Sequence, residues 1–214
     1  ALLLRNGLGT AMVLPVWLAQ RGRWPGLAVL RVHAARAVVV ACMAALFFYG
    51  LVRIPMAEGI ALSFIAPLIA LYLAALVLGE KVRRGAAIAS MLGIAGVVLI
   101  AAARLASGDG AAGAKSSPEG IAAILFSAVF YAINLVIQRR QAQIAGPVEI
   151  ALFQNMLVGL VLLPAAPFLY AVPGSGALID IALAAALSTL ALLFLAWGYA
   201  RAEAQVLLPI EYTA

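Results

Sequence analysis

The sequence predicts an all-α membrane protein built from two inverted five-helix repeats. Three observations lead to this prediction: a very apolar composition, a series of apolar segments of helical length, and an internal repeat. Hydrophobic residues make up 66% of the 214 residues, charged residues make up 10%, and the mean hydropathy is +1.13. A soluble protein carries about 25% charged residues, so lipid must be the solvent for most of this protein's surface.

The apolar segments are separated by short polar or basic clusters. None of them shows the alternation with period two that is typical of a strand, and an open sheet edge is not tolerated in lipid. We therefore expect eight helices, the eighth of them partial, at residues 8–19, 35–51, 60–78, 86–103, 120–137, 148–170, 177–199 and from 202 onward.

Polar residues mark several of the expected helix ends. Ser117–Glu119 combines a capping serine, a proline for the first turn and an acid for the positive end of the helix dipole, which is typical of a helix start. The preceding stretch 104–117 is rich in Gly, Ala and Ser and predicts a loop. We expect the helix that begins here to end before the polar run Gln138–Gln141.

The internal repeat relates the two halves of the chain. Asn6 precedes Pro15 by nine positions, and Asn155 precedes Pro164 by nine positions, at an offset of 149. The stretch Tyr49–Arg53 then matches Trp197–Arg201 at an offset of 148. Landmarks in the same order at nearly the same offset indicate a duplication of one structural unit.

The repeat also predicts the number of helices. Helix 120–137 has no partner in the first half, and helix 86–103 has none in the second. One further helix at each end gives a ten-helix bundle of about 270 to 290 residues, at about 20 residues per span, of which helices two to nine are present and the last is partial. An odd number of spans inverts the second unit. We expect the first repeat at 1–103, a loop at 104–118 and the second repeat at 119–214.

Positive charge is distributed unevenly between the two expected sides of the membrane. One side has ten Lys and Arg residues and the other has four, so the richer side is expected to face the cytoplasm. This predicts a multi-pass protein of the cell membrane, with the lipid bilayer as its surroundings and both termini of the ten-helix protein in the cytoplasm. The expected cytoplasmic residues are Arg21, Arg23, Arg31, Arg36, Lys81, Arg83, Arg84, Arg139, Arg140 and Arg201.

Several functional classes lack their sequence signals. No basic stripe carries interleaved aromatic residues, so no nucleic-acid partner is expected. No nucleophile with a base, paired carboxylates or phosphate-binding loop is present, so no enzyme is expected. His33 is expected in a basic loop without a second ligand nearby, so neither a metal nor a cofactor is predicted. The single cysteine, Cys42, cannot form an internal disulfide.

Three stretches resemble the EamA family of the drug/metabolite transporter superfamily. They are Ala66–Pro67 with Leu78–Glu80, the glycine-rich segment 85–100, and Pro209–Tyr212. The resemblance implies ten helices in two inverted repeats, of which this chain is a fragment without the first and last. It also implies a secondary transporter that exports or exchanges small organic solutes, such as amino acids, metabolites or drugs, by alternating access. The alternative is a non-transporting membrane scaffold or partner-binding subunit.

Candidate cavity residues are polar or aromatic side chains within the expected spans. Glu211 lies eight residues after Glu203, about 12 Å along a helix and inside the bilayer, where a carboxylate is costly and indicates a functional site. A structural hydrogen bond is the open alternative for Glu211. Further polar candidates are Tyr131, Asn134, Gln154 and Asn155. In the resembled family helices three, four, eight and nine line the cavity, which implies a substrate site of Tyr49, Ser63, Trp197, Glu211 and Tyr212. The oligomeric state is left open.

Overall fold

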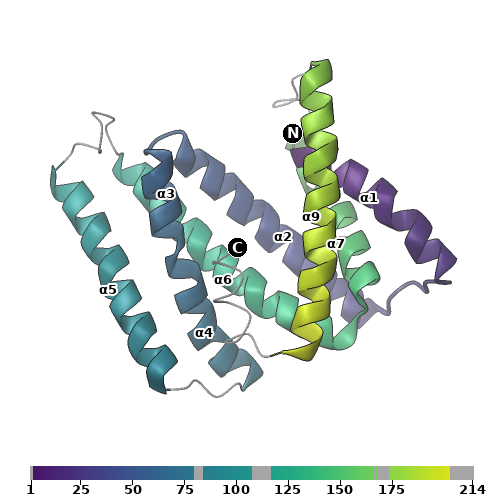
Figure 1. The fold of residues 1–214 in the computed structure, drawn as a ribbon, viewed down its shortest axis with the longest axis horizontal. Helices are drawn as coiled ribbons and strands as arrows, with labels where there is room; N and C mark the ends of the chain where they lie inside the picture. Colours follow the sequence, from purple (N-terminus) through teal and green to yellow (C-terminus); the bar gives the residue numbers. More distant parts are fainter. Residues whose placement is uncertain (1, 80–83, 108–116, 166, 168–173, 203–214) are drawn as a thin grey trace. The chain divides into compact units, whose positions relative to one another are not determined.

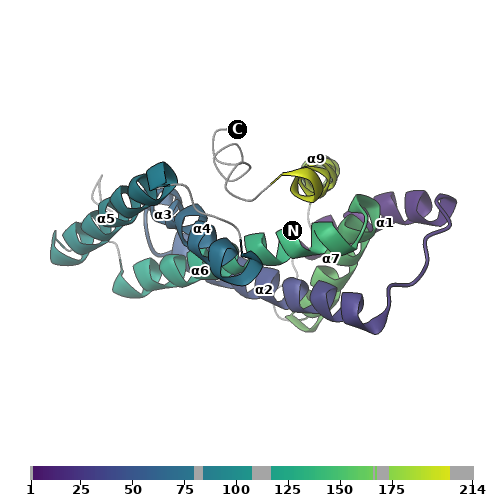
Figure 2. The same cartoon turned by 90° about the horizontal axis from the view of Figure 1, so that it is seen from below.

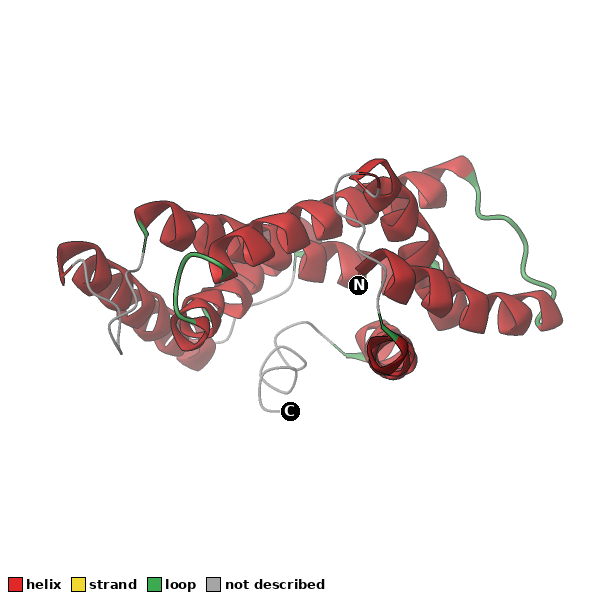
Figure 3. Ribbon diagram, turned by 90° about the horizontal axis from the view of Figure 1, so that it is seen from above, coloured by secondary structure: helices red, strands yellow, loops and turns green. Residues whose placement is uncertain are grey.

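A computed structural model describes residues 2–79, 84–107, 117–165, 167 and 174–202. The described part of the chain contains helices joined by short connections and no strand (Figure 3), which confirms the all-α prediction. Five stretches are long and apolar enough to cross a membrane: Leu2–Ala19, Leu27–Leu51, Met56–Leu78, Pro118–Ile144 and Gly176–Arg201. The helices are α1 (Leu2–Ala19), α2 (Leu27–Leu51), α3 (Met56–Ser63), α4 (Ile65–Leu78), α5 (Arg84–Ser107), α6 (Pro118–Ile144), α7 (Pro147–Leu162), the short 3-10 helix η1 (Leu163–Ala165) and α9 (Ser175–Arg201).

Several helices are longer than the sequence predicted. Helix α2 begins at Leu27 instead of 35, so His33 is helical and its predicted place in a loop is wrong. Helix α6 runs through Gln138–Gln141 to Ile144, where an end was predicted. Helix α5 continues to Ser107, into the expected loop. The predictions for 168–170 and for the helix after 202 lie almost entirely outside the described residues.

The predicted start of α6 is confirmed in detail. The Ser117 hydroxyl oxygen accepts a hydrogen bond of 3.0 Å from the backbone N–H of Gly120. Pro118 is the first helical residue and Glu119 lies in the first turn. This arrangement satisfies one of the N–H groups that a helix leaves unpaired at its start, and proline there loses no hydrogen bond.

The end of α1 adopts a Schellman motif. The N–H of Gly22 donates to the Trp17 carbonyl and the N–H of Arg21 donates to the Leu18 carbonyl, both at 3.0 Å. In this motif one residue takes the left-handed conformation that glycine usually supplies, and here Arg21 has φ = 52°. A Cβ at Gly22 would overlap the Trp17 ring, so the chain can pass the indole here only with glycine.

The span Met56–Leu78 is interrupted at Phe64, between α3 and α4. Pro67 explains the interruption, because a proline lacks an N–H and its ring clashes with the carbonyl four residues earlier, here that of Ser63. Pro164 accompanies a second change, the 3-10 turn that follows α7. Pro15, by contrast, lies within an uninterrupted α1.

The chain forms two compact units, each drawing on both halves of the sequence. Among the described residues, the first unit comprises 2–41 and 137–202, and the second lies within 42–136. In the first unit α1, α7 and α9 pack against one another (Figure 1 and Figure 2). Val13 and Trp17 of α1 meet Leu152 and Phe153 of α7 in its core. The predicted repeats, 1–103 and 119–214, divide the chain by duplication, whereas the two units divide it by packing. The repeat boundaries therefore stay a prediction.

In the second unit α2 and α6 approach closely through glycine. A Cβ on Gly50 would lie 2.6 Å from the Ile124 side chain and 3.0 Å from the Gly120 carbonyl oxygen. Such close approach is typical of helix interfaces in membranes, where small residues let backbones come together. Ile54, Leu62 and Ile124 form part of the core beside this contact. Helix α5 packs on α3 and α4.

Candidate functional site

A polar network is buried in the first unit, where apolar side chains would be expected. Helix α2 contributes His33 and Arg36, helix α6 contributes Gln138 and Gln141, and α7 contributes Glu149 from its first turn. Both pairs have a spacing of three residues, which places their members on the same helix face. His33, Arg36, Gln138 and Gln141 are all at most 3% exposed.

Arg36 is held between the two glutamines. Its two terminal nitrogens donate hydrogen bonds of 2.7 Å, one to Oε1 of Gln141 and one to Oε1 of Gln138. Hydrogen bonds from a guanidinium are stronger than those between neutral groups. These hydrogen bonds therefore connect the first half of α2 to the end of α6. They also explain why α6 continues through the polar residues Gln138–Gln141.

His33 joins the network to α7. One ring nitrogen, Nε2, lies 3.2 Å from Oε1 of Glu149, and Nδ1 lies 2.7 Å from the Gln141 amide nitrogen. With the Gln141 amide as donor to Nδ1, Nε2 carries the proton and donates to Glu149. The imidazole also stacks on Phe153, with ring centroids 5.0 Å apart and planes 17° apart. Phe153 in turn meets Trp17 and Trp24 edge to face.

Ionisable residues within apolar spans are costly and indicate a functional site by default. His33 and Arg36 both lie in the span Leu27–Leu51. The sequence analysis missed this network, because it assigned His33 to a loop, Arg36 to the cytoplasmic end of a helix and Gln138–Gln141 to a helix end. The shared spacing of three residues was the available signal. Among the described residues no group of three His, Cys, Asp or Glu side chains is placed to hold a metal ion.

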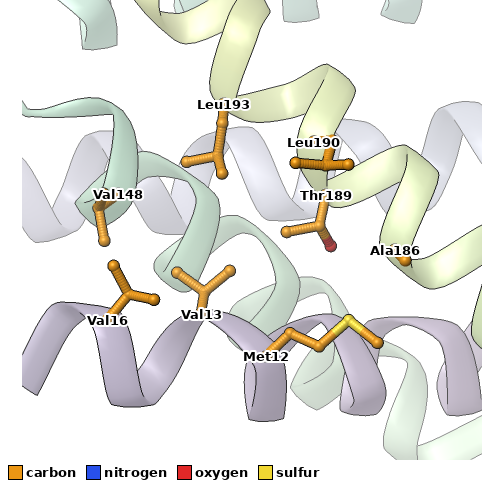
Figure 4. Close-up of a pocket in the computed structure, with 8 residues that line it drawn as sticks. All are labelled: Met12, Val13, Val16, Val148, Ala186, Thr189, Leu190 and Leu193. Atoms are coloured by element: carbon orange, nitrogen blue, oxygen red, sulfur yellow. The ribbon is translucent and has the colours of Figure 1, made fainter.

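A cavity of about 340 Å³ lies in the same unit, between α1, α7 and α9 (Figure 4). Its walls are aliphatic except for Thr189 of α9 and the thioether of Met12. Helix α7 carries two further buried polar residues, Gln154 and Asn155. Gln154 Oε1 and Asn155 Nδ2 have no hydrogen-bond partner among the described residues. The first unit therefore contains both apolar space and unsatisfied polar atoms.

The described members of the predicted substrate site are divided between the two units. Tyr49 and Ser63 lie in the second unit and Trp197 lies in the first. The Ser63 hydroxyl donates 2.7 Å to the Ile60 carbonyl, next to the interruption at Phe64. None of the three lines the cavity of Figure 4. Glu211 and Tyr212 lie outside the described residues.

Tyr49 and Trp197, which the internal repeat equates, each contact an arginine four residues later in the chain. The Arg53 guanidinium lies 3.5 Å from the Tyr49 ring centroid, and that of Arg201 lies 4.3 Å from the Trp197 ring. Each arginine also donates to the backbone carbonyl of its aromatic partner, at 2.9 Å and 3.1 Å. Cation–π contacts of this kind are favourable. Their recurrence at matched positions supports the repeat read from the sequence.

Comparisons with known proteins agree with this fold. Residues 1–102 match the EamA-like transporter family. Two curated proteins of Helicobacter pylori, from strains 26695 and J99, are each named "Uncharacterized transporter" and are 32% identical to the chain over 184 and 181 residues. Each alignment covers 82% of this chain and 59% of the relative, so the chain spans less than two thirds of these relatives' length.

A solved crystal structure has the same fold, with a TM-score of 0.73 at 21% identity. The match covers 99% of this chain and 74% of that chain. The match of residues 1–102, the named relatives and the apolar spanning helices lead to one conclusion: residues 1–102 belong to the EamA-like transporter family, and the chain as a whole is similar to proteins named as transporters.

Proposed function

We propose that the protein exports or exchanges small organic solutes, such as amino acids, metabolites or drugs, across the cell membrane by alternating access. The observation that carries the proposal is the family match, joined by two relatives named as transporters that align with 82% of the chain. The buried polar network on α2, α6 and α7 supports it, because ionisable groups are kept within apolar spans where a function requires them.

The proposed mechanism is a rocking of two inverted repeats, 1–103 and 119–214, about a site near the bilayer midplane. Breaks and bends at Pro67 and Pro164 favour it, since each accompanies a change in helix geometry. Pro209 is proposed to act in the same way, and Pro15, which lies within an uninterrupted α1, is proposed to supply a flexible position. The proposed substrate site consists of Tyr49, Ser63, Trp197, Glu211 and Tyr212.

The decisive experiment is solute flux into proteoliposomes that contain the protein expressed from its complete gene. Radiolabelled amino acids and other small organic solutes are tested in counterflow, with empty liposomes as the blank. A transporter accelerates the uptake of at least one solute above that blank. A membrane scaffold or partner-binding subunit gives the same uptake as empty liposomes for every solute, and that result would refute the proposal.

The role of Glu211 is tested with the substitution Glu211→Gln, which keeps size and hydrogen bonding but removes the titratable charge. If Glu211 lines the substrate site, initial flux per folded molecule changes in rate or in pH dependence. The matched control is Asp180→Asn, which removes a charge from an exposed acid on α9. Flux curves of Glu211→Gln that superimpose on wild type across the pH series remove Glu211 from the site.

A further inference from the structure

The cavity between α1, α7 and α9 has one polar side chain aimed into it. Figure 4 shows Thr189 pointing from α9 toward Met12 and Val13 of α1. The remaining wall is aliphatic. The full lining consists of Met12, Val13, Val16, Val148, Ala186, Thr189, Leu190 and Leu193. A volume of about 340 Å³ falls within the range of small-molecule sites.

The Thr189 hydroxyl is buried without a hydrogen-bond partner. The residue is 5% exposed, and Oγ1 has no partner among the described residues. Leaving a buried hydroxyl unsatisfied destabilises a protein, so the unpaired Thr189 hydroxyl requires an explanation. Thr10 offers a contrast in the same unit, because its hydroxyl donates 2.9 Å to the Asn6 carbonyl of its own helix.

The position of Thr189 along α9 places this hydroxyl near the middle of a span. At 1.5 Å per residue, it lies about 21 Å from the helix start at Ser175 and about 18 Å from the end at Arg201. The hydrocarbon core of a bilayer is about 30 Å thick. The ester and headgroup atoms of a phospholipid therefore lie about 15 Å away from this depth, beyond hydrogen-bonding distance.

The chemistry of the cavity excludes its simplest occupants. A buried water needs two to four polar partners, and the lining supplies one hydroxyl and a weakly accepting thioether. A lipid acyl chain fills apolar space but leaves the hydroxyl unsatisfied. An occupant that suits both the wall and Thr189 is mainly aliphatic and carries a hydrogen-bonding atom within its body.

We propose that this cavity is a binding site for a small amphipathic molecule, aliphatic over most of its surface and bearing one hydroxyl or carbonyl oxygen that pairs with Thr189. Met12, Val16 and Leu190 of the lining are 42%, 47% and 51% exposed, so the site opens toward the apolar surroundings of the span. The ligand therefore enters from the bilayer. Because the proposal concerns binding, it stands or falls independently of transport.

Photolabelling tests the proposal directly. The probe is a medium-chain aliphatic alcohol that carries a diazirine, and the reference probe is the matching alkane diazirine without the hydroxyl. Both are applied to the protein, expressed from its complete gene, in lipid nanodiscs, and adducts are mapped by mass spectrometry. We expect alcohol adducts to concentrate on the lining residues Met12, Val13, Val16, Ala186, Thr189, Leu190 and Leu193 and to be displaced by excess unlabelled alcohol. The alkane is expected to label exposed α9 residues outside the lining, such as Leu183 and Leu187, as strongly as the lining residues.

Two pairs of variants separate binding from folding. Thr189→Val keeps the shape of the side chain and removes the hydroxyl, so alcohol labelling falls by about twofold to tenfold, the effect of one hydrogen bond. Thr10→Val, whose wild-type hydroxyl is already paired, leaves labelling unchanged. Ala186→Phe fills the cavity and abolishes the adducts, whereas Ala184→Phe, at an exposed position of the same helix, does not.

All variants are first shown to be monodisperse with wild-type melting behaviour, and a Thr189→Ser variant, which keeps the hydroxyl, must retain labelling. The proposal is overturned if the alcohol and the alkane label the same residues to the same extent. It is also overturned if Thr189→Val leaves alcohol labelling unchanged, because the cavity would then be filled by lipid chains alone.

Discussion

Substituting Gly50 by alanine tests the close approach of α2 and α6 in the second unit. The added methyl group would lie 2.6 Å and 2.8 Å from two carbons of Ile124 and 3.0 Å from the Gly120 carbonyl oxygen. Carbon atoms normally pack at about 3.5 to 4.0 Å. Ile124 is fully buried and the Gly120 oxygen belongs to the backbone, so neither neighbour can turn aside and the helices must separate.

The expected cost follows from two opposing effects. Overpacking a close contact destabilises a protein by about 1 to 3 kcal/mol. Alanine is a better helix former than glycine by about 1 kcal/mol, which partly offsets that cost. The control Gly96→Ala isolates the contact, because a Cβ at Gly96 of α5 has no described atom within 4 Å. The difference between the two variants is therefore the packing cost alone, about 1 to 3 kcal/mol.

Thermal unfolding in mild detergent, followed by far-UV circular dichroism, measures this difference. For a protein of this size about 1 kcal/mol corresponds to a shift in Tm of about 2 to 4 °C. We therefore expect Gly50→Ala to melt about 2 to 12 °C below Gly96→Ala. Equal melting temperatures would show that α2 and α6 do not approach through Gly50, and the packing described for the second unit would be wrong.

Three further predictions concern the polar network, the orientation and the end of α1. Arg36→Leu removes two hydrogen bonds of 2.7 Å and should lower the free energy of unfolding by about 3 kcal/mol. Arg31→Leu, at an exposed position of α2, should change the free energy of unfolding by about 0.5 kcal/mol at most. Equal losses in the two variants would contradict the network. In a Cys42→Ala background, cysteines at Arg83 or Arg140 should be shielded from an impermeant thiol reagent in intact cells and a cysteine at Gly110 should be labelled; labelling of the first two would reverse the orientation. Arg21→Gly should raise stability by up to about 1 kcal/mol, because Arg21 has φ = 52°, and an unchanged or lower Tm would count against the motif.

Local sequence signals predicted the features that depend on neighbouring residues. The start of α6 depends on Ser117, Pro118 and Glu119, which act on the first turn of their own helix. The interruption at Phe64, within the segment 60–78 that was expected as one helix, is explained just as locally by Pro67, three residues away. Apolar length identified the five stretches that are long enough to span, since hydrocarbon thickness sets that length. The predicted spans 86–103 and 148–170 correspond to α5 and α7, which are not among these five.

The polar network could not be predicted in the same way, because its partners are far apart in the sequence. Arg36 and Gln141 are separated by 105 positions, and His33 and Glu149 by 116. Read alone, Gln138–Gln141 is too polar for an apolar span and indicates a helix end. Paired with α2, the side-chain oxygens of Gln138 and Gln141 accept hydrogen bonds from Arg36 inside the protein, and the helix continues to Ile144. The extension of α2 back to Leu27 has the same origin.

The candidate substrate site was predicted from a resemblance, and its members stay predictions. The sequence did identify the equivalence of Tyr49 and Trp197, and both carry a stacked arginine four residues later. It could not identify the cavity beside Thr189, because a hydroxyl without a partner is visible only when the surrounding helices are in place. A lone threonine in an apolar run usually bonds to its own helix.

The tryptophans are distributed unevenly between the two units. Trp17 and Trp24 lie in the cluster in which His33 stacks on Phe153. All three tryptophans, Trp17, Trp24 and Trp197, belong to the first unit, and residues 42–136 of the second contain none. Tryptophan fluorescence therefore reports local opening of the first unit and does not report opening of the second. The only thiol, Cys42, falls at the beginning of the second unit. Emission and thiol reactivity recorded on one unlabelled sample should thus resolve whether the two units open together or in sequence.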